Sequence, residues 1–256
     1  MEITADLRAL GGGRVWSLMV SLFGDLAQGR GQAIDGPVLS RIMAGLGVKP
    51  EAARVALHRL RNDGWIASEK RGRTSRHSLT PKGRSESAAA SPRIYARPED
   101  AGKDWRLVLA ASTEQAQSDT LARAGFTQVM PRVFVGPTTA PVPEGALAFS
   151  GNSAPDWLCH EIAPTDLLPE YTRLNAVLTK LLSDLLQLDP VSALDTAVLR
   201  CLVVHNWRRL VLKHPAMPTA LMPDHTPITA CHATVDRFFT TYPRPALRAI
   251  SSELET

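Results

Sequence analysis

Cysteine is scarce in this chain, and long apolar runs are missing from it. The 256 residues include three cysteines, Cys159, Cys201 and Cys231, and this low, odd number suits a reducing compartment better than a disulfide framework. No apolar run approaches the roughly 20 residues that a membrane-spanning helix needs. The opening residues, MEITADLRALGGGR, carry acidic side chains and lack the basic and then apolar order of a secretory signal. These absences lead us to expect a soluble cytoplasmic protein with no membrane contact.

Catalytic motifs are missing as well. The sequence contains no GxSxG, no phosphate loop GxxxxGK(S/T) and no HExxH, and its GGGR at residues 11–14 follows no strand. Cysteine and histidine lie together at three places, Cys159-His160-Glu161, Cys201 with His205, and Cys231-His232. None of these forms the Cys-x-x-Cys or His-x-x-x-His pair that is usual in structural zinc sites, and free cysteines are commonly small buried hydrophobes. We therefore expect no enzyme, no bound metal and no cofactor.

Positive charge is concentrated near the N-terminus. The whole chain has a formal net charge of +4, yet residues 1–84 hold 14 lysines and arginines against 7 acidic residues, and the other 172 residues hold 15 against 18. A basic front part on a slightly acidic body suggests that one module meets a polyanion while the rest serves another purpose. Because many solvated surfaces are basic, this imbalance needs support from a motif.

Three helices are predicted in the basic part. RVWSLMVSLFGDLAQ at residues 14–28 repeats apolar residues at helical spacing, a second helix follows from Pro37, and a third begins near Pro50. In the third helix, Arg54, His58 and Arg61 stand at i, i+4 and i+7 and therefore project to one side. A helix, a short turn and a second helix that reaches base edges is the arrangement of DNA-binding helix-turn-helix proteins. On this helix alone, an ordinary solvated face is an equally good interpretation.

The residues after the third helix favour the nucleic-acid interpretation. WIASEK is predicted to be a strand, RGRTS a turn around Gly72, and RHSLT a returning strand. This two-stranded wing carries the basic and hydroxyl residues Lys70, Arg71, Arg73, Thr74, Ser75 and Arg76. Arginine and lysine neutralise phosphates, hydroxyls donate to phosphate oxygens, and an arginine at the tip of a wing can enter a narrow minor groove. We predict that the helical stripe contacts bases and that the wing contacts the DNA backbone.

Three stretches of this part, RVWSLMVSLFGDLAQGRG, VKPEAARVALHRLRNDGW and KRGRTSRHSLTPKG, resemble the N-terminal winged helix of the PaaX family of bacterial transcriptional regulators. The family pattern has Leu-Gly-Asp in its first helix, where this sequence has Phe23-Gly24-Asp25, and the segment from Arg54 to Leu60 matches the Arg-x-Ala-Leu-x-Arg-Leu of its third helix. Known members repress operons of phenylacetic acid catabolism, so the resemblance implies a repressor that binds double-stranded operator DNA. Because bacterial operators are commonly palindromic, we also expect a homodimer.

The predicted organisation is an α+β protein of three modules. Residues 1–84 form the winged helix-turn-helix, and residues 85–102, which are small, polar and proline-punctuated, are predicted to be a linker. Residues 103–160 alternate strand, helix, strand and strand, and DWRLVLA…LARAGFTQVMPRVFVGP resembles the ferredoxin-like middle domain of the PaaX family. Residues 161–256 show helical spacing and are predicted to form an α-helical C-terminal domain that dimerises or senses a ligand.

An effector is implied by the same resemblance, because the family is released from DNA by an aryl-acetyl coenzyme A thioester, typically phenylacetyl-CoA. HNWRRLVLKHPAMPTALMP resembles the C-terminal signature of the family, but it has His214 in place of an acidic residue and His225-Thr226-Pro227 in place of Trp-Pro-Gly. The candidate residues are Arg132, Trp207, Arg208 and Arg209, whose cations and aromatic surface suit an acyl-CoA, and His205, which the resemblance adds. Three alternatives stay open: Trp207 packs in the core, the ligand differs from the usual one, or a ligand-binding protein uses its winged helix for protein contact.

Overall fold

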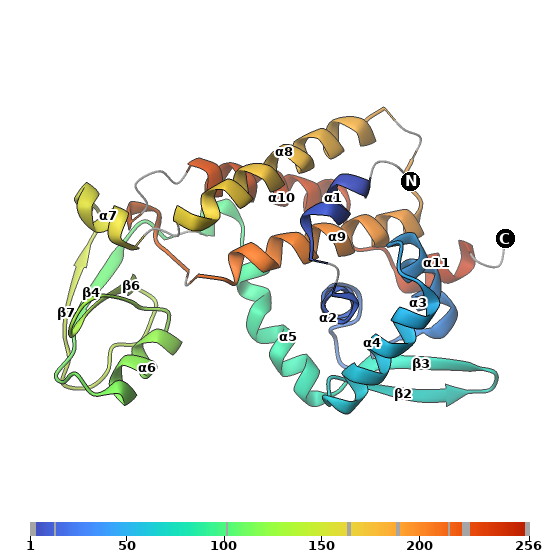
Figure 1. Ribbon diagram of the computed structural model, residues 1–256, viewed down its shortest axis with the longest axis horizontal. Helices are drawn as coiled ribbons and strands as arrows, with labels where there is room; N and C mark the ends of the chain where they lie inside the picture. The colour runs from blue at the N-terminus through green and yellow to red at the C-terminus, as the bar shows by residue number, and fades with distance from the viewer. Residues whose placement is uncertain are drawn as a thin grey trace. The chain divides into compact units, whose positions relative to one another are not determined.

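The computed structural model describes residues 4–12, 14–100, 102–162, 165–187, 190–214, 216–221 and 226–253. It combines helices with two small antiparallel sheets, which is an α+β composition (Figure 1). The chain forms two compact units: the first contains Met1–Tyr95, Arg173–Arg209 and Thr234–Thr256, and the second contains Ala96–Thr172 and Leu210–Ala233. Within the described ranges, no helix is both long and apolar enough to cross a membrane.

The N-terminal part of the first unit places helices beside a small sheet. Its elements in chain order are α1 (Ala5–Leu10), α2 (Val15–Leu26), β1 (Ile34–Asp35), α3 (Gly36–Gly45), α4 (Pro50–Asn62), β2 (Ile66–Arg71), β3 (Thr74–Leu79) and α5 (Pro81–Ile94). The sheet has the strand order β1-β3-β2, and both pairings are antiparallel. Proline stands in the first turn of α3, α4 and α5, where its missing N–H is not needed and its fixed φ favours the helix. The helices predicted from Pro37 and near Pro50, and the strands on both sides of Gly72, are therefore present.

Helix α2 is buried on nearly its whole circumference. Its periodicity predicts one broad apolar face, yet Ser21 and Asp25 are buried together with the apolar residues. The C-terminal helices that belong to the first unit in whole or in part are α8 (Leu168–Leu185), α9 (Ala193–Val211), α10 (Thr226–Thr241) and α11 (Leu247–Glu253), and α9 is bonded directly to α2. The Cys201 thiol of α9, for example, donates to the carbonyl of Leu18 over 3.6 Å. Figure 1 shows α2 nearly end-on between α5 and α4.

A buried carboxylate fastens α2 to the C-terminal helices. The two oxygens of Asp25 accept hydrogen bonds from Arg200 of α9 at 2.7 and 2.8 Å, and one of them also accepts from Arg244 and from the Tyr95 hydroxyl, both at 2.9 Å. Burial by itself would raise the pKa of Asp25, but the hydrogen bonds and charge of Arg200, and then of Arg244, outweigh it and lower the pKa. Asp25 is therefore charged at neutral pH, and it joins segments that lie far apart in the sequence.

The second unit is built on an antiparallel sheet. Its elements are β4 (Trp105–Leu109), α6 (Gln115–Arg123), β5 (Thr127–Met130), β6 (Val133–Pro137), β7 (Leu147–Gly151) and α7 (Asp156–Ile162). The strand order β5-β6-β4-β7 is that of a ferredoxin-like sheet, but residues 138–146, all of which the structure describes, form a loop where that fold has its second helix. Phe134 packs with Leu121 of α6 in one core cluster, and its neighbour Val135 packs with Leu158 of α7 in another, as alternating residues of a strand do.

The segment at residues 85–102 differs from the predicted linker. Helix α5 continues to Ile94, and the break between the two units falls at Tyr95–Ala96, near the middle of that segment. The helix forms despite its small, polar residues because tertiary contacts support it. The Gln28 side chain of the α2 region donates to the hydroxyls of Ser87 and Ser91 at 2.9 and 2.7 Å.

The C-terminal region also differs from its prediction as a single domain at residues 161–256. Residues 173–209 and 234–256 belong to the first unit, and residues 210–233 belong to the second. The buried contact between Asp25 and Arg200 gives the physical reason, because it incorporates α9 into the core of the N-terminal helices.

Candidate nucleic-acid interface

Helix α4 presents a cationic face to solvent. Its Ala56 and Leu60 are buried and attach it to the rest of the unit. Arg54, His58 and Arg61 are exposed, in agreement with their spacing. The Arg54 side chain is 77% exposed, and its ion pair with Glu51, at 3.9 Å, is of the exposed kind that contributes little to stability. A buried face thus fixes the helix while its cationic face remains open to a ligand.

Arg59 lies off this face. Its guanidinium is 3.6 Å from the Asp63 carboxylate and lies over the Trp16 ring, 5.1 Å from the ring centroid. A cation in this position is attracted by the quadrupole of the indole. Arg59 therefore has intramolecular partners, which agrees with its exclusion from the predicted base-contacting set.

Strands β2 and β3 form a hairpin with a basic tip. Gly72 has a φ of 58° at the turn, a left-handed conformation that glycine adopts without steric penalty. The register pairs Lys70 with Ser75 and Arg71 with Thr74, so each basic residue near the end of β2 lies opposite a hydroxyl residue of β3. Cation and hydroxyl donors are thereby placed side by side, as a phosphate-binding strand pair requires.

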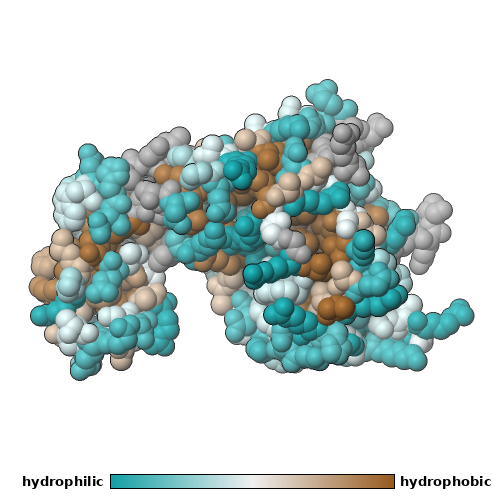
Figure 2. Space-filling model, in the orientation of Figure 1, coloured by the Kyte–Doolittle hydropathy of each residue, from teal (hydrophilic) through white to brown (hydrophobic). Residues whose placement is uncertain are grey.

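Most of the predicted hairpin residues are accessible. The exposed ones are Lys70, Arg71, Arg73, Thr74 and Ser75. Arg76 is half-buried, and its Nε lies 3.9 Å from the Asp35 carboxylate of β1. Its guanidinium is therefore partly engaged by an acidic residue of the protein. Figure 2 shows that hydrophilic residues cover the hairpin, whose tip projects from the surface of its unit.

One groove of about 820 Å³ joins the helix to the hairpin. Its lining includes Arg54, His58 and Arg61 from α4 and Arg73, Thr74 and Ser75 from the hairpin. Pro37 and Ser40 of α3 contribute to another wall. The structure thus brings six of the nine predicted nucleic-acid residues around a single concavity, whereas Lys70, Arg71 and Arg76 do not line it.

An apolar residue that was not among the predicted contacts also lines this groove. Val55 is 70% exposed, so its side chain is accessible to a ligand in the groove. Its sequence position carried a signal, because it stands off the core stripe formed by Ala56 and Leu60. An exposed methyl group among cations suits contact with the methyl group of thymine in a major groove.

His77 lies at the edge of the same groove but is buried. The Nδ1 atom of its ring is 2.8 Å from the Ser68 hydroxyl. Burial, and then the charge of Arg61, lower the pKa of His77, while Asp35 acts in the opposite direction. His77 is therefore neutral at neutral pH, and the positive charge of the groove comes from its arginines.

Trp207, a predicted effector-binding residue, is a core residue instead. Its side chain is 1% exposed, and the indole N–H donates to the carbonyl of Ile94 at the end of α5 over 2.9 Å. A buried indole needs such a partner, and this one is supplied within the protein. Trp207 consequently offers no surface to an acyl group, which corrects its predicted role in favour of the packing alternative.

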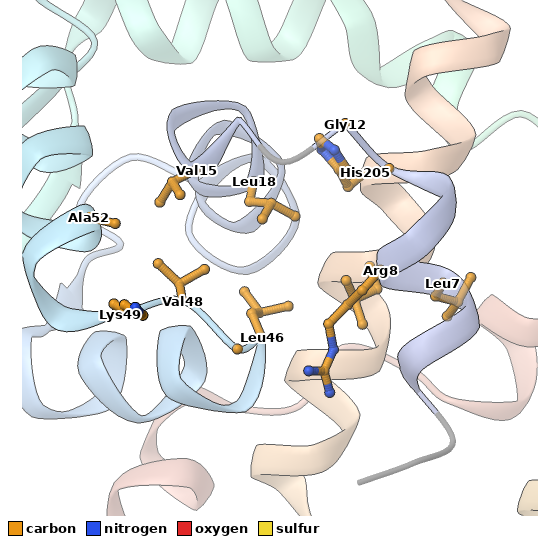
Figure 3. Close-up of a pocket in the computed structure, with 13 residues that line it drawn as sticks. Leu7, Arg8, Gly12, Val15, Leu18, Leu46, Val48, Lys49, Ala52 and His205 are labelled. Atoms are coloured by element: carbon orange, nitrogen blue, oxygen red, sulfur yellow. The ribbon is translucent and has the colours of Figure 1, made fainter.

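The other predicted residues of α9 also contact the N-terminal helices. Arg208 donates to the Ser21 hydroxyl over 3.3 Å, and Arg209 donates to the carbonyl of Leu10 over 2.9 Å. His205 is buried and lines a pocket beside the turn between α3 and α4 (Figure 3). Of these residues, His205 is the one that a ligand in that pocket would meet.

Arg132 and His214 lie in the second unit. Arg132 has a φ of 66°, its Nε donates to the carbonyl of Ala110 over 2.8 Å, and its own carbonyl accepts from the Ala110 N–H over 2.7 Å. These bonds give it a role in a turn. His214 Nε2 is 2.8 Å from the Tyr171 hydroxyl, and His225 lies outside the described residues.

The cysteines have the environment of small core residues. Cys159, Cys201 and Cys231 are buried with free thiols. Burial raises the pKa of each thiol, to about 12 for Cys231, and therefore opposes the thiolate that metal binding requires. Among the described residues, no three His, Cys, Asp or Glu side chains are grouped so that they could hold a metal ion.

A helix with a cationic stripe beside a basic hairpin is typical of the class of DNA-binding transcription regulators. Two family models match the chain: one described as PaaX-like protein covers residues 14–83, and one described as PaaX-like protein C-terminal domain covers residues 164–250. Together these matches include more than half of the sequence. The chain belongs to the PaaX family of transcriptional regulators.

Similar proteins extend the match along the chain. It is 28% identical over 235 residues to the transcriptional repressor PaaX of Escherichia coli strain K12, which covers 82% of this chain and 74% of the relative. Among solved structures, the uncharacterized protein Rv0674 of Mycobacterium tuberculosis has the same fold, with a TM-score of 0.52 and 16% identity, over 93% of this chain and 95% of that one.

Proposed function

We propose that this protein is a transcriptional repressor whose α2–α4 and β2–β3 elements act as a winged helix-turn-helix on operator DNA. The observation that carries the proposal is the groove in which the cationic stripe of α4 meets the arginine-rich hairpin. Neither feature alone would separate a DNA reader from a solvated basic surface. Their convergence on one concavity supports a ligand that is polyanionic and long enough to touch both.

The two walls of the groove would contact different parts of the DNA. A helix fits a major groove about 12 Å wide, and arginine there makes its commonest specific contact, a bidentate pair with guanine. Arg54 and Arg61 would make such contacts, and His58 would add a shorter donor between them. The hairpin residues Arg71 and Arg73 would neutralise phosphates or enter the neighbouring minor groove. Base reading and backbone positioning would thus come from different backbone elements.

The proposed regulatory role follows from the family and from the name of the relative in Escherichia coli. We propose a cytoplasmic, non-enzymatic repressor of a catabolic operon of the phenylacetate type, released by an acyl-CoA such as phenylacetyl-CoA. By linkage, this effector must bind the DNA-incompetent conformation better than the DNA-binding one. A homodimer on a palindromic operator would place two copies of α4 about one helical turn, or a multiple of it, apart.

Fluorescence anisotropy on DNA from upstream of the protein's own gene tests the DNA-binding role. We expect sequence-selective binding whose logarithmic salt slope falls by about 1 when Arg73→Ala removes one phosphate contact. Arg248→Ala, which removes an exposed arginine of α11 outside the groove, is the matched control and should leave the slope unchanged. Binding without salt dependence or sequence preference would instead favour the alternative in which the hairpin and helix contact a protein.

A thermal-shift screen of acyl-CoA thioesters tests the effector. A thioester that raises the melting temperature should also dissociate the DNA complex, because the two ligands would favour different conformations. Light scattering after size exclusion measures the oligomeric state of the free and DNA-bound protein. A protein that no thioester stabilises would remove the acyl-CoA part of the proposal and leave the DNA-binding part standing.

A further inference from the structure

A second concavity lies entirely within the first unit. It shares Val48 with the groove between α4 and the hairpin, which is called the recognition groove below. It has a volume of about 280 Å³ and is lined by Leu7, Arg8, Gly11, Gly12, Val15, Leu18, Leu46, Gly47, Val48, Lys49, Ala52, Leu202 and His205. Figure 3 shows Val15 and Leu18 of α2 facing Leu46 and Val48 across it, with Ala52 on one side and His205 on the other. The walls therefore come from α1, α2, α4, α9 and the turn between α3 and α4.

The size and lining of the pocket restrict what it can hold. Most of the lining is aliphatic or glycine, and Leu7, Leu18 and Leu46 are buried. An apolar cavity of about 150 Å³ is large enough for benzene, while pockets for drug-sized molecules begin at about 300 Å³. One substituted aromatic ring or a short aliphatic chain would fit, and the nucleotide part of a coenzyme A thioester would not.

His205 supplies a polar atom to these apolar walls. It is 2% exposed, and its Nε2 has no hydrogen-bond partner among the described residues. Buried polar atoms are normally hydrogen-bonded, so a ligand that pairs with Nε2 would be stabilised there. The opposite ring nitrogen, Nδ1, lies 3.4 Å from the Ser21 hydroxyl.

The Ser21 hydroxyl has three possible partners. It lies 3.1 Å from the carbonyl of Ser17, accepts from Arg208 over 3.3 Å, and faces Nδ1 of His205. Its one hydrogen can be donated to the Ser17 carbonyl or to Nδ1, and the tautomer of His205 follows from that choice. Nε2 accepts in one tautomer and donates in the other, and a hydroxyl group, which can both donate and accept, satisfies it in either.

Burial and the surrounding positive charges keep the His205 ring neutral. Burial, and then the charges of Arg208 and Arg209, lower the pKa of His205 to about 4, although the carbonyls of Gly12 and Ser17 oppose the shift. Arg8 also lines the pocket and adds to this positive field. A cationic ligand would be repelled by these arginines, whereas a neutral hydroxyl compound such as a phenol would not.

The pocket is in contact with the DNA-reading helix. Val48 lines both this pocket and the recognition groove. Gly47 has a φ of 76°, and a Cβ at that position would lie 2.9 Å from a guanidinium nitrogen of Arg8, so the turn packs directly against α1. An occupant that displaces Val48 or Arg8 would therefore shift the start of α4.

We propose that this pocket binds a small, uncharged, mainly apolar molecule whose one polar group hydrogen-bonds to Nε2 of His205, such as a phenol, and that its occupancy alters DNA binding through the α3–α4 turn. The binding itself is independent of the proposed function, and the coupling to DNA rests on it. The site is also distinct from an acyl-CoA site, because the pocket is too small for the nucleotide.

Binding is tested with phenol and toluene as probes on the full-length protein. Titration calorimetry should show saturable one-site binding of phenol, roughly fivefold tighter than toluene, because only phenol can hydrogen-bond to Nε2. His205→Phe should remove that preference. Equal affinities for the two probes in the wild type would overturn the hydrogen bond to His205, and no saturable binding of either probe would overturn the site.

A second variant protects the test against a misfolded His205→Phe. Val15→Phe enlarges a half-buried residue that lines the pocket and not the groove, so it should abolish phenol binding while the cooperative thermal unfolding of a folded protein is retained. Leu186→Phe, at a residue outside the pocket that is 76% exposed, is the matched control and should bind phenol like the wild type. Unchanged phenol binding in Val15→Phe would place the ligand elsewhere.

Coupling is measured by operator anisotropy with and without saturating phenol. We expect the operator dissociation constant to change severalfold in the wild type and not in Val15→Phe. Saturable phenol binding with an unchanged operator constant would overturn the coupling alone. A wild-type protein that binds phenol but no operator would overturn the proposed function and leave the pocket assignment intact.

Discussion

Helices α2 and α4 lie in the same unit, and both have sequences that predict an amphipathic helix. The two helices differ in how much of their surface is buried. Helix α2 is buried on nearly its whole circumference, and its polar residues Ser21 and Asp25 are buried. Helix α4 buries Ala56 and Leu60 and leaves its cations exposed. The difference comes from α9, which covers the polar side of α2 and supplies partners for it. Helix α2 is therefore part of the core of the unit, while the cationic face of α4 is accessible to a ligand.

The largest effect on stability is expected when the buried hydrogen bonds of Asp25 on α2 are removed. Asp25→Ala leaves Arg200, whose side chain is 3% exposed, as a buried charge without its carboxylate. Removing one partner of a buried pair costs about 3–5 kcal/mol of the free energy of unfolding. Chemical denaturation should show this loss. Asp63→Ala, which removes an exposed partner of Arg59 on α4, should cost at most about 1 kcal/mol. Similar losses in the two variants would mean that Asp25 is not structurally special.

The same pair of helices separates what could be predicted from what could not. The bounds of α4 and the hairpin turn follow from local signals, such as Pro50 and Gly72, and the spacing of Arg54, His58 and Arg61 gave their shared face. The burial of Asp25 depends on Arg200 and Arg244, which stand 175 and 219 residues away in the chain. No local pattern specifies such partners, because each acts only after the chain has folded.

The same physical reason explains the effector-binding residues. Trp207 was predicted from its chemistry, but the carbonyl that accepts its N–H belongs to Ile94, 113 residues earlier, and it makes Trp207 part of the core. The pocket beside His205 likewise combines α1, α2, α4 and α9. Residues whose role depends on side-chain exposure along one helix were predictable, and residues whose role depends on contacts between distant segments were not.

The next effect concerns the open face of α4. Arg61→Ala should weaken specific operator binding by about 1–3 kcal/mol if Arg61 reads a base, with little change in the free energy of unfolding. Arg59→Ala is the matched control on the same helix, because Arg59 is engaged with Asp63 and Trp16. Its operator affinity should stay near the wild-type value in an anisotropy titration. An equal loss of affinity in both variants would assign the effect to net charge instead of position.

A smaller effect is expected for His205 of α9, which is buried and neutral, and it concerns the pH dependence of stability. The folded pKa of about 4 lies below the usual 6.5, so the unfolded chain takes up a proton first as the pH falls. Stability that is present above pH 6.5 is therefore lost between about pH 6.5 and 4, and the loss reaches about 2 kcal/mol at pH 5. Denaturation at pH 7.5 and pH 5 should show a smaller pH dependence for His205→Gln than for the wild type. Parallel profiles would contradict the buried, neutral state.

The smallest effect tests the exposed apolar residue of α4. Val55→Ala removes two methyl groups that have no intramolecular role, because the side chain is 70% exposed. Since alanine has the higher helix propensity, the free energy of unfolding should stay the same or rise by up to about 0.7 kcal/mol. Specific operator binding should weaken by about 1 kcal/mol or less if Val55 meets a thymine methyl, while non-specific binding stays constant. Anisotropy on the operator and on unrelated DNA measures the two quantities separately. An equal change in both would show that Val55 acts through the shape of α4 and not through a base, and the open face would then read sequence by its cations alone.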